Sequence, residues 1–256
     1  MILLDKLTKR FGAQTAVDAL SFEIPPGQIV GFLGPNGAGK STTLKMLTGM
    51  MEPSDGRAAV CGFDLQTQPI EVKRKVGFVP ESGAVFESLT GLEYLEMVAA
   101  LYGIPQNAAR IRIKQFIAFF DLSFETLTDK LLGAYSKGMR RKVVITSALL
   151  HNPLVVFFDE PLDGLDANAA VGFKALIQML AREGKTIVYS SHILDVVERV
   201  CHRVIIIDKG RLLLDGKPDE LVAVHNSGTL EKLFTQLTGG AELERRAEDF
   251  ARTFRP

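Results

Sequence analysis

A glycine-rich loop that ends in a lysine and a serine is the most distinctive chemical feature of the sequence. It runs Gly34-Pro35-Asn36-Gly37-Ala38-Gly39-Lys40-Ser41 and satisfies the pattern GxxxxGK[ST]. Its glycines let the backbone curl so that several N–H groups point inward, toward an anion. Lys40 adds a point charge for terminal phosphates, and the Ser41 hydroxyl is a ligand for Mg²⁺. The loop therefore predicts a site for the phosphates of a nucleoside triphosphate.

The sequence on either side of this loop supports that interpretation. The apolar run Ile29–Leu33 precedes it, and a helix-forming run from Thr42 to Leu47 follows it. A helix that begins at the loop adds free N–H donors and the positive end of its dipole, so Thr42 joins the predicted phosphate contacts. An ordinary glycine-rich turn is the alternative. The combination of strand, loop, Lys-Ser pair and helix argues strongly against it.

Two adjacent carboxylates follow a second apolar run. Leu154–Phe158 leads directly into Asp159 and Glu160. If that run is a parallel strand, both carboxylates lie at the carboxyl edge of the sheet, beside the phosphate loop. Asp159 is then suited to hold Mg²⁺, and Glu160 to orient and deprotonate an attacking water. Two solvated charges after a core strand are the alternative, and the phosphate loop upstream makes this less attractive.

The elements that position these groups can be predicted from hydrophobic periodicity. Continuous apolar runs are typical of strands buried on both faces of a parallel sheet. Such runs occur at 29–33, 76–79, 154–158, 187–189 and 204–207. Near the start, Leu20, Phe22 and Ile24 alternate with polar residues, as in a half-exposed antiparallel strand. Between residues 81 and 151 the apolar residues have helical spacing, which predicts a helical lobe inserted into an α/β core.

Composition bounds the possible functions. The 256 residues include 30 Lys plus Arg and 30 Asp plus Glu, so the charge is balanced and no basic excess points to nucleic acid. The two cysteines, Cys61 and Cys201, predict free thiols in a reducing compartment. Neither a signal peptide at the start nor a membrane-length apolar segment is evident. We therefore expect a cytoplasmic protein that reaches a membrane only through a partner.

Five further segments make the sequence resemble one family, the ABC ATPases. They occur in the family's order over residues 2 to 221. They are an aromatic position at Lys9-Arg10-Phe11-Gly12, a Q-loop position at Val79-Pro80-Glu81, a signature at Tyr135-Ser136-Lys137-Gly138-Met139, a D-loop at Asp163-Gly164-Leu165-Asp166, and a switch histidine at Ser190-Ser191-His192. Three positions depart from the commonest family pattern, namely Glu81, Lys137 and Asp163. We interpret them as markers of an exporter branch, which residues 89–95 and 229–239 also resemble.

The resemblance implies a fold and a domain organisation. The fold is α/β, a P-loop NTPase (RecA-like) parallel-sheet core with an N-terminal antiparallel β subdomain and an inserted α-helical subdomain. The ATPase domain is expected at residues 1–225, with the helical subdomain at about 82–151. A C-terminal helical extension is expected at 226–256, including a charged helical tail from Glu242 to Arg246.

The resemblance also assigns roles to individual residues. Phe11 is expected to stack on adenine, a role that suits its flat π surface. Ser136 and Gly138 are expected to bind the γ-phosphate held by a second ATPase subunit, at the start of a helix that Ser136 can cap. His192 is expected to contact the γ-phosphate, and Glu81 to lie near Mg²⁺. For Ser136 alone an ordinary helix cap is the alternative, and for His192 a buried, hydrogen-bonded histidine is. We expect His151, His202 and His225 to be structural.

The hypothesis that follows is an ATPase subunit that binds ATP and Mg²⁺ and drives a separate membrane permease of an exporter. The second subunit is a copy of this chain or a relative. The permease is expected at a cleft near Glu81, Val85, Phe86 and Leu89, although the last three are equally typical of a lobe core. A soluble ABC machine for translation, DNA maintenance or metallocluster assembly is the second hypothesis. A small-molecule kinase or GTPase is a third, which the signature and His192 argue against.

Overall fold

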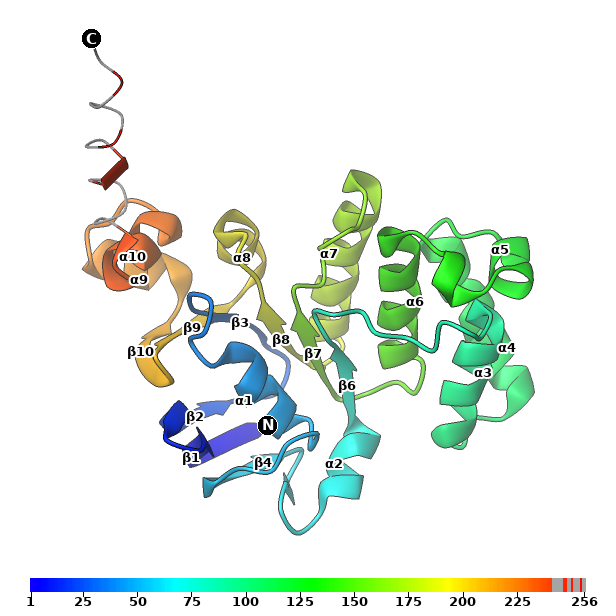
Figure 1. The fold of residues 1–256 in the computed structure, drawn as a ribbon, viewed down its shortest axis with the longest axis horizontal. Coiled ribbons are helices and arrows are strands. Elements are labelled where there is room, and N and C mark those ends of the chain that lie inside the picture. The colour runs from blue at the N-terminus through cyan, green and yellow to red at the C-terminus, as the bar shows by residue number, and fades with distance from the viewer. Residues whose placement is uncertain (241–245, 248–249, 251–253, 255–256) are drawn as a thin grey trace.

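The computed structural model describes residues 1–240, 246–247, 250 and 254, and its strands form two sheets (Figure 1). The smaller sheet has the order β2-β1-β4-β5 and the larger has the order β10-β9-β3-β8-β7-β6. The strands are β1 (Ile2–Phe11), β2 (Gln14–Ile24), β3 (Ile29–Leu33), β4 (Asp55–Val60), β5 (Phe63–Asp64), β6 (Val76–Val79), β7 (Val155–Asp159), β8 (Thr186–Ser190), β9 (Arg203–Asp208) and β10 (Arg211–Gly216).

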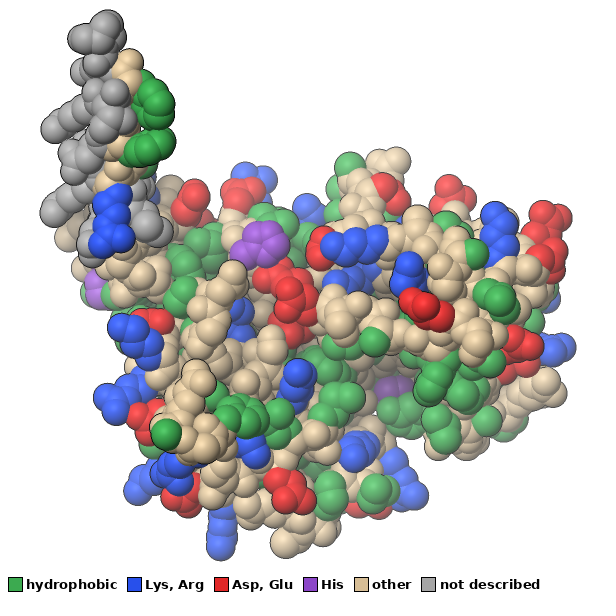
Figure 2. Space-filling view, in the orientation of Figure 1, with side chains coloured by type: hydrophobic (Ala, Val, Ile, Leu, Met, Phe, Trp, Pro, Cys, Tyr) green, Lys and Arg blue, Asp and Glu red, His purple; other side chains and the backbone are tan. Residues whose placement is uncertain are grey.

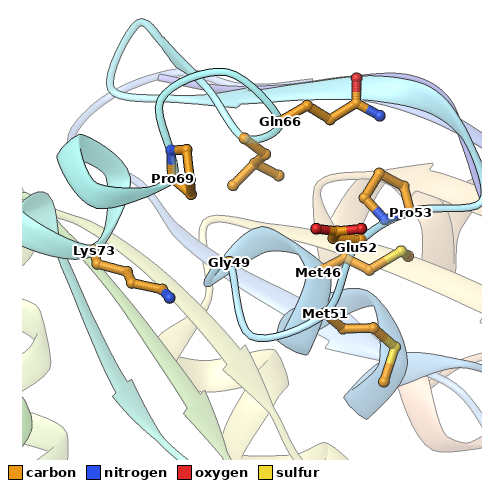
Figure 3. Close-up of a pocket in the computed structure, with 9 residues that line it drawn as sticks. Met46, Gly49, Met51, Glu52, Pro53, Gln66, Pro69 and Lys73 are labelled. Atoms are coloured by element: carbon orange, nitrogen blue, oxygen red, sulfur yellow. The ribbon is translucent and has the colours of Figure 1, made fainter.

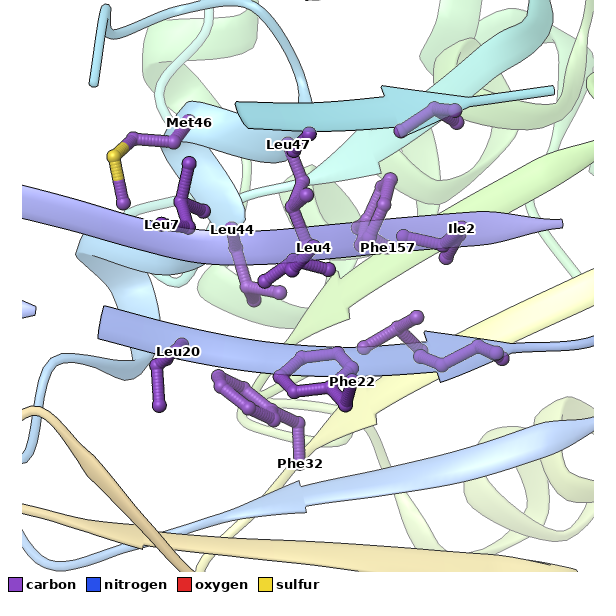
Figure 4. Close-up of a cluster of buried hydrophobic side chains, with 14 of the residues drawn as sticks. Ile2, Leu4, Leu7, Leu20, Phe22, Phe32, Leu44, Met46, Leu47 and Phe157 are labelled. Atoms are coloured by element: carbon purple, nitrogen blue, oxygen red, sulfur yellow. The ribbon is translucent and has the colours of Figure 1, made fainter. Parts of the chain in front are cut away.

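The small sheet is antiparallel and covers one face of the large sheet. Alternate residues of β2 are buried, among them Leu20, Phe22 and Ile24, which confirms the predicted half-exposed strand. These side chains meet Phe32 of β3 and Phe157 of β7 in one hydrophobic cluster (Figure 4). Burial of each such side chain contributes about 1.5–3 kcal/mol. The two sheets are thus held together by a shared core.

The large sheet confirms the predicted parallel core. Each of its four internal neighbour pairs, β9 with β3, β3 with β8, β8 with β7 and β7 with β6, is parallel. All five residues of β3, β7 and β8 are buried, as continuous apolar runs predict. The edge strand β10 is antiparallel to β9, and the two form the expected hairpin after Asp208. The sheet is therefore mixed only at this edge.

Helices cover both faces of the large sheet (Figure 1). They are α1 (Lys40–Leu47), α2 (Pro69–Lys75), α3 (Gly91–Leu101), α4 (Gln106–Phe119), α5 (Phe124–Asp129), the short 3₁₀ helix η1 (Leu132–Ala134), α6 (Lys137–Leu149), α7 (Ala167–Arg182), α8 (Leu194–Val200), α9 (Pro218–Val224) and α10 (Leu230–Leu237). Helix α1 packs with the small sheet, whereas α6, α7, α8 and α10 pack on the opposite face. Successive strand residues point to opposite faces, so both faces need apolar cover.

A helical lobe lies at one end of the sheet, beyond β6 (Figure 1). Helices α3, α4, α5 and α6 share a separate hydrophobic cluster that includes Leu95, Ile113 and Leu127. Between residues 81 and 151 the structure contains no strand, only an isolated bridge between Thr90 and Leu131. This agrees with the predicted helical insertion. Helix α3 begins at a capping box, in which Thr90 and Glu93 each accept the other's backbone N–H.

The described part of the C-terminal extension is a packing helix. Leu230 and Leu233 of α10 are buried in the cluster that also contains α7 and α8. Residues 242–245 of the predicted charged tail lie outside the described residues. In the described part of the chain no helix is both long and apolar enough to cross a bilayer. Both cysteines are free thiols, as predicted.

Candidate nucleotide-binding site

The phosphate loop connects β3 to α1 through a backbone that only glycine tolerates. A Cβ at Gly34 would lie 2.4 Å from the Ile207 carbonyl oxygen, so no side chain fits there. Gly39 has φ of 103° and closes against the Ala16 carbonyl oxygen, which a Cβ would approach to 2.4 Å. These contacts explain why positions 34 and 39 are glycine. They also tie the loop to β9 and to the hairpin between β1 and β2.

Lys40 lies folded over this loop at the start of α1. Its Nζ donates to the Gly34 carbonyl oxygen at 2.6 Å and to the Pro35 carbonyl oxygen at 3.1 Å. Burial lowers the pKa of Lys40, and the carboxylates of Glu160, Asp159 and Glu81 oppose that shift. The ammonium group therefore lies at the loop, in the field of three acids, as a phosphate ligand should.

Asp159 and Glu160 occupy the end of β7, between β6 and β8. Asp159 is only 3 % exposed and pairs in register with Ser190 of β8. Glu160 turns out of the strand with φ of 49°, while its N–H donates to the Ser190 carbonyl oxygen at 3.0 Å. Both carboxylates thus lie at the carboxyl edge of the sheet, as the sequence predicted. The positive φ of Glu160 is a conformation that non-glycine residues rarely adopt, of the kind found at functional sites.

Glu160 is partly buried and lies beside His192. Its Oε2 lies 2.9 Å from Nδ1 of His192. Burial raises the pKa of Glu160, and the hydrogen bond from His192 works against that rise. A carboxylate with a raised pKa is a better proton acceptor than a fully solvated one. His192 itself is exposed, with 75 % of its side chain accessible, so it differs from a buried structural histidine.

The oxygen groups around Asp159 fit a hard divalent cation. No side-chain hydrogen bond within the described residues reaches the Asp159 carboxylate. The neighbouring Ser190 Oγ is buried and has no hydrogen-bond partner. No described group of three His, Cys, Asp or Glu side chains could hold a metal alone. Carboxylate and hydroxyl oxygens that leave coordination positions for phosphate and water are what Mg²⁺ prefers.

Phe11 ends β1 and presents an open aromatic face. The ring is 49 % exposed, and Nζ of Lys9 lies 5.4 Å from its centroid. The same hairpin contacts Gly39 through Ala16. Phe11 is therefore carried on the segment that closes against the phosphate loop, which is compatible with stacking on a base.

The signature segment packs on the D-loop of its own chain. Ser136 caps α6, because its Oγ accepts the N–H of Met139 at 3.2 Å. A Cβ at Gly138 would lie 2.4 Å from the Gly164 carbonyl oxygen, so Gly138 permits a close backbone contact. Lys137 pairs with Asp163 at 2.6 Å. Within the described residues, neither Ser136 nor Gly138 forms a hydrogen bond with the phosphate loop.

Glu81 and the other histidines do not contact the phosphate loop in any described hydrogen bond or ion pair. Glu81 follows β6, so it lies at the same sheet edge as Asp159, but its side chain forms no described ion pair. His202 accepts the Ile29 N–H at 3.1 Å, and His151 bonds the Val76 carbonyl oxygen and stacks on Tyr102. Both are structural, as expected. Sequence reasoning gave no role to Ser190, although it stands in the switch segment, or to the buried Arg141, because neither residue type points to a function by itself.

Two hollows lie away from the phosphate loop. One, of about 480 Å³, is next to the C-terminal end of α1, with Met46, Met51 and Lys73 among its lining residues (Figure 3). Phosphates bind at helix N-termini, so this hollow is not the nucleotide site. The other, of about 520 Å³, lies between β6 and the helical lobe and includes Phe86 and Tyr102. Hydrophobic side chains gather around a hollow on that side of the lobe (Figure 2).

The comparisons with known proteins agree with this geometry. The family model "ABC transporter" matches residues 17–163. The chain is 38 % identical to the ABC transporter ATP-binding protein NatA of Bacillus subtilis, over 91 % of this chain and 96 % of that protein. It is 37 % identical to the Nod factor export ATP-binding protein I of Ralstonia nicotianae, over 87 % and 68 % of the two chains.

Solved structures give the same result. The ATP-binding subunit of an ABC transporter superposes with a TM-score of 0.87 at 31 % identity, covering 93 % of this chain and 99 % of that one. A dimeric bacterial ABC transporter cassette gives a TM-score of 0.79 at 25 % identity, over 85 % and 98 %.

The fold and the site together define a P-loop ATPase of the α/β class. The chain belongs to the ABC transporter family, as an ATP-binding subunit that hydrolyses ATP.

Proposed function

We propose that Glu160 is the general base of ATP hydrolysis in this subunit. The observation that carries the proposal is its half-buried carboxylate at the end of β7, raised in pKa by burial and hydrogen-bonded by His192. Glu160 accepts a proton from the attacking water, and Lys40 stabilises charge on the terminal phosphates. His192 orients Glu160 and contacts the γ-phosphate.

The other predicted residues bind and orient the substrate. Backbone N–H groups of Gly34–Thr42 surround the phosphates at the positive end of α1. Phe11 stacks on adenine. Ser41 and Asp159 would hold Mg²⁺, with Glu81 nearby, and the cation would neutralise negative charge on the phosphates. The unpartnered Ser190 Oγ supports an additional polar ligand or water at this point.

The site is completed by a second ATPase subunit. Ser136 and Gly138 lie at the N-terminus of α6, and neither contacts the phosphate loop of its own chain. A helix N-terminus with free N–H groups is suited to an anion. The similar cassette that is described as dimeric supports the proposal that the anion is the γ-phosphate bound by the other subunit. The second subunit is another copy of this chain or a related protein.

The subunit drives a multi-spanning permease at the inner face of the cell membrane, and the transport direction is export. The relative named for Nod factor export supports the direction. The permease contacts the hollow between β6 and the helical lobe, where Phe86 is 61 % exposed and Tyr102 is 38 % exposed. This hollow adjoins Pro80, the residue before Glu81, so a permease segment seated there reaches the ATP site through one short loop.

Glu160→Gln tests the catalytic assignment, because glutamine keeps the size of the side chain but cannot accept the proton. We expect ATP affinity to stay within about threefold while the turnover falls by on the order of 10²–10⁴. The variant is also expected to remain dimeric in ATP during gel filtration. Glu183→Gln, at an exposed carboxylate after α7, is the matched control. Normal steady-state hydrolysis by Glu160→Gln would refute the assignment.

Phe86→Asp tests the permease contact. It places a charge in the apolar hollow, so we expect it to abolish co-purification with a multi-spanning protein from detergent-solubilised membranes, while basal hydrolysis stays within about twofold. Phe124→Asp is the control, since Phe124 is 46 % exposed and does not line that hollow. Recovery of a soluble partner and no permease with the wild-type chain would favour the soluble ABC machines instead.

A further inference from the structure

Arg141 is a buried guanidinium that forms no ion pair with a carboxylate in the described part of the chain. It belongs to α6 and is 3 % exposed. Its Nη1 donates to the Pro80 carbonyl oxygen at 2.7 Å, and its Nη2 donates to the Glu81 carbonyl oxygen at 2.9 Å. Its Nε donates to the Asp163 carbonyl oxygen at 3.3 Å. A buried charge is costly unless it is well satisfied, so this arrangement needs a reason.

The three carbonyl groups belong to two separate segments of the site. Pro80 and Glu81 follow β6, where Glu81 lies at the predicted Mg²⁺ edge. Asp163 is the first residue of the D-loop. Its backbone N–H donates to the carbonyl oxygen of Glu160 at 3.2 Å, so the D-loop is bonded to the residue proposed as the base. Each of these bonds uses a different guanidinium nitrogen, so the arginine spans acceptors that lie farther apart than the single nitrogen of a lysine can reach. One side chain of the signature helix is thus bonded to the segments that carry Glu81 and Glu160.

Other contacts make the signature segment and the D-loop one packed unit. The backbone at Gly138 lies against Gly164, and Lys137 pairs with Asp163 on the exposed side. The bonds of Arg141 to Pro80 and Glu81 extend this unit to β6. Burial lowers the pKa of Arg141, and the acids of the site, Asp163 first, oppose this. The guanidinium stays charged and lies in the field of those acids.

We propose that Arg141 is a positioning residue that couples the signature helix to catalysis by holding the segments of Glu81 and Glu160 in fixed relation to α6. When Ser136 and Gly138 contact the nucleotide of a second subunit, α6 takes up a defined position. Arg141 then holds the segments of Glu81 and Glu160 in the matching position. The inference rests on the proposed role of Glu160. It predicts that Arg141 is needed for turnover and not for ATP binding.

The neighbouring Arg140 provides a matched control on the same helix. Its Nη1 pairs with Glu87 at 3.1 Å, and its Nη2 donates to the Tyr135 carbonyl oxygen at 3.4 Å. Both partners precede α6 within the helical lobe. Replacing either arginine removes the same charge and similar bulk, but only Arg141 connects α6 to the edge of the sheet.

The test compares Arg141→Gln, Arg141→Lys and Arg140→Gln with the wild-type chain, and includes Glu160→Gln as a reference. The measurements are thermal unfolding, the Kd for ATP, kcat and KM, and hydrogen exchange of peptides that span residues 80–84 and 160–166. For Arg141→Gln we expect kcat to fall by roughly 30–100-fold, with Kd and KM within about threefold, because misplacement of a catalytic group acts mainly on turnover. Exchange in both peptides is expected to be faster.

Arg141→Lys should recover only part of kcat, since one ammonium nitrogen replaces the three guanidinium nitrogens that bond Pro80, Glu81 and Asp163. Arg140→Gln should keep kcat within about threefold and leave both peptides unchanged. If folded Arg141→Gln keeps its kcat, or if Arg140→Gln loses as much, the inference is overturned. Should Arg141→Gln fail to fold, the lysine variant decides, and full kcat in that variant overturns the inference. If the proposed role of Glu160 is wrong, Glu160→Gln will hydrolyse ATP normally, and this result is separate from the results for Arg141.

Discussion

The two halves of the proposed ATP site are built in different ways. The phosphate-loop half lies at the ends of β3, β7 and β8, strands whose residues are all buried. Its groups contact one another within the chain, as the Glu160–His192 contact at 2.9 Å demonstrates. The signature half lies on a separate helical lobe with its own hydrophobic cluster. Its helix α6 also packs on the large sheet through Val144 and Ile145, and it is bonded to the D-loop and to the segment after β6 by Lys137 and Arg141.

This difference suggests a division of labour. A site positioned by a packed parallel sheet is rigid, because side chains in close-packed interiors have little freedom to move. A site positioned by a helix cap and by hydrogen bonds across a lobe boundary can move as a body when a partner seats on it. ATP binding should therefore depend on the sheet half, and the coupling of binding to hydrolysis on the lobe half.

The largest predicted effect on ATP affinity is in the sheet half. Lys40→Ala removes the ammonium group that lies over the loop, so we expect the Kd for ATP to rise roughly 100-fold, since charge-assisted hydrogen bonds contribute about 1.5–3 kcal/mol each. A fluorescent-nucleotide titration measures this. Lys45→Ala, an exposed lysine on the same helix, should bind ATP normally. Equal losses of ATP affinity in Lys40→Ala and Lys45→Ala would contradict the contrast between the two halves, because binding would then not depend on the phosphate loop.

A smaller predicted effect, on stability as a function of pH, concerns the contact between the helical lobe and the core. The ring of His151 stacks on Tyr102 at the end of α3 and bonds the Val76 carbonyl oxygen of β6. Burial lowers the pKa of His151 to about 4, from 6.5. The folded protein therefore takes up this proton near pH 4, while the unfolded chain takes it up near 6.5. The contribution of neutral His151 to the free energy of unfolding is therefore complete above pH 6.5 and is lost as the pH falls toward 4.

His151→Phe keeps a ring on Tyr102 but cannot be protonated. We expect the free energy of unfolding of the wild-type chain to fall by about 1 kcal/mol more than that of this variant between pH 7 and pH 5, allowing for partial solvent access to the ring. Urea unfolding at both pH values measures the difference. His225→Phe, at an exposed histidine, should retain the wild-type dependence. If His151→Phe does so too, the boundary histidine does not control this pH response.

Much of the sheet half could be predicted from the sequence, since the GxxxxGK[ST] loop and the Asp159-Glu160 pair both follow continuous apolar runs. Parallel strands then place them at one edge. The hydrogen bond between His192 and Glu160 could not be predicted, because it depends on two loops from different strands. The packing of Gly138 on Gly164 was equally invisible, since the signature suggested only a role toward another subunit. Arg141 carries no pattern, and its three acceptors are backbone oxygens that no sequence spacing reveals.

The division between the halves is tested most directly by comparing ATP affinity and turnover in Ser136→Asp. Aspartate caps a helix about as well as serine, so α6 should remain intact, but its charge repels a phosphate of the partner's nucleotide. The account predicts that the Kd for ATP stays within about threefold, while turnover falls by roughly 50-fold or more, as expected when an interaction made only in the assembled site is lost. Turnover close to that of the wild-type chain, or a loss of ATP affinity as large as the loss of turnover, would contradict it.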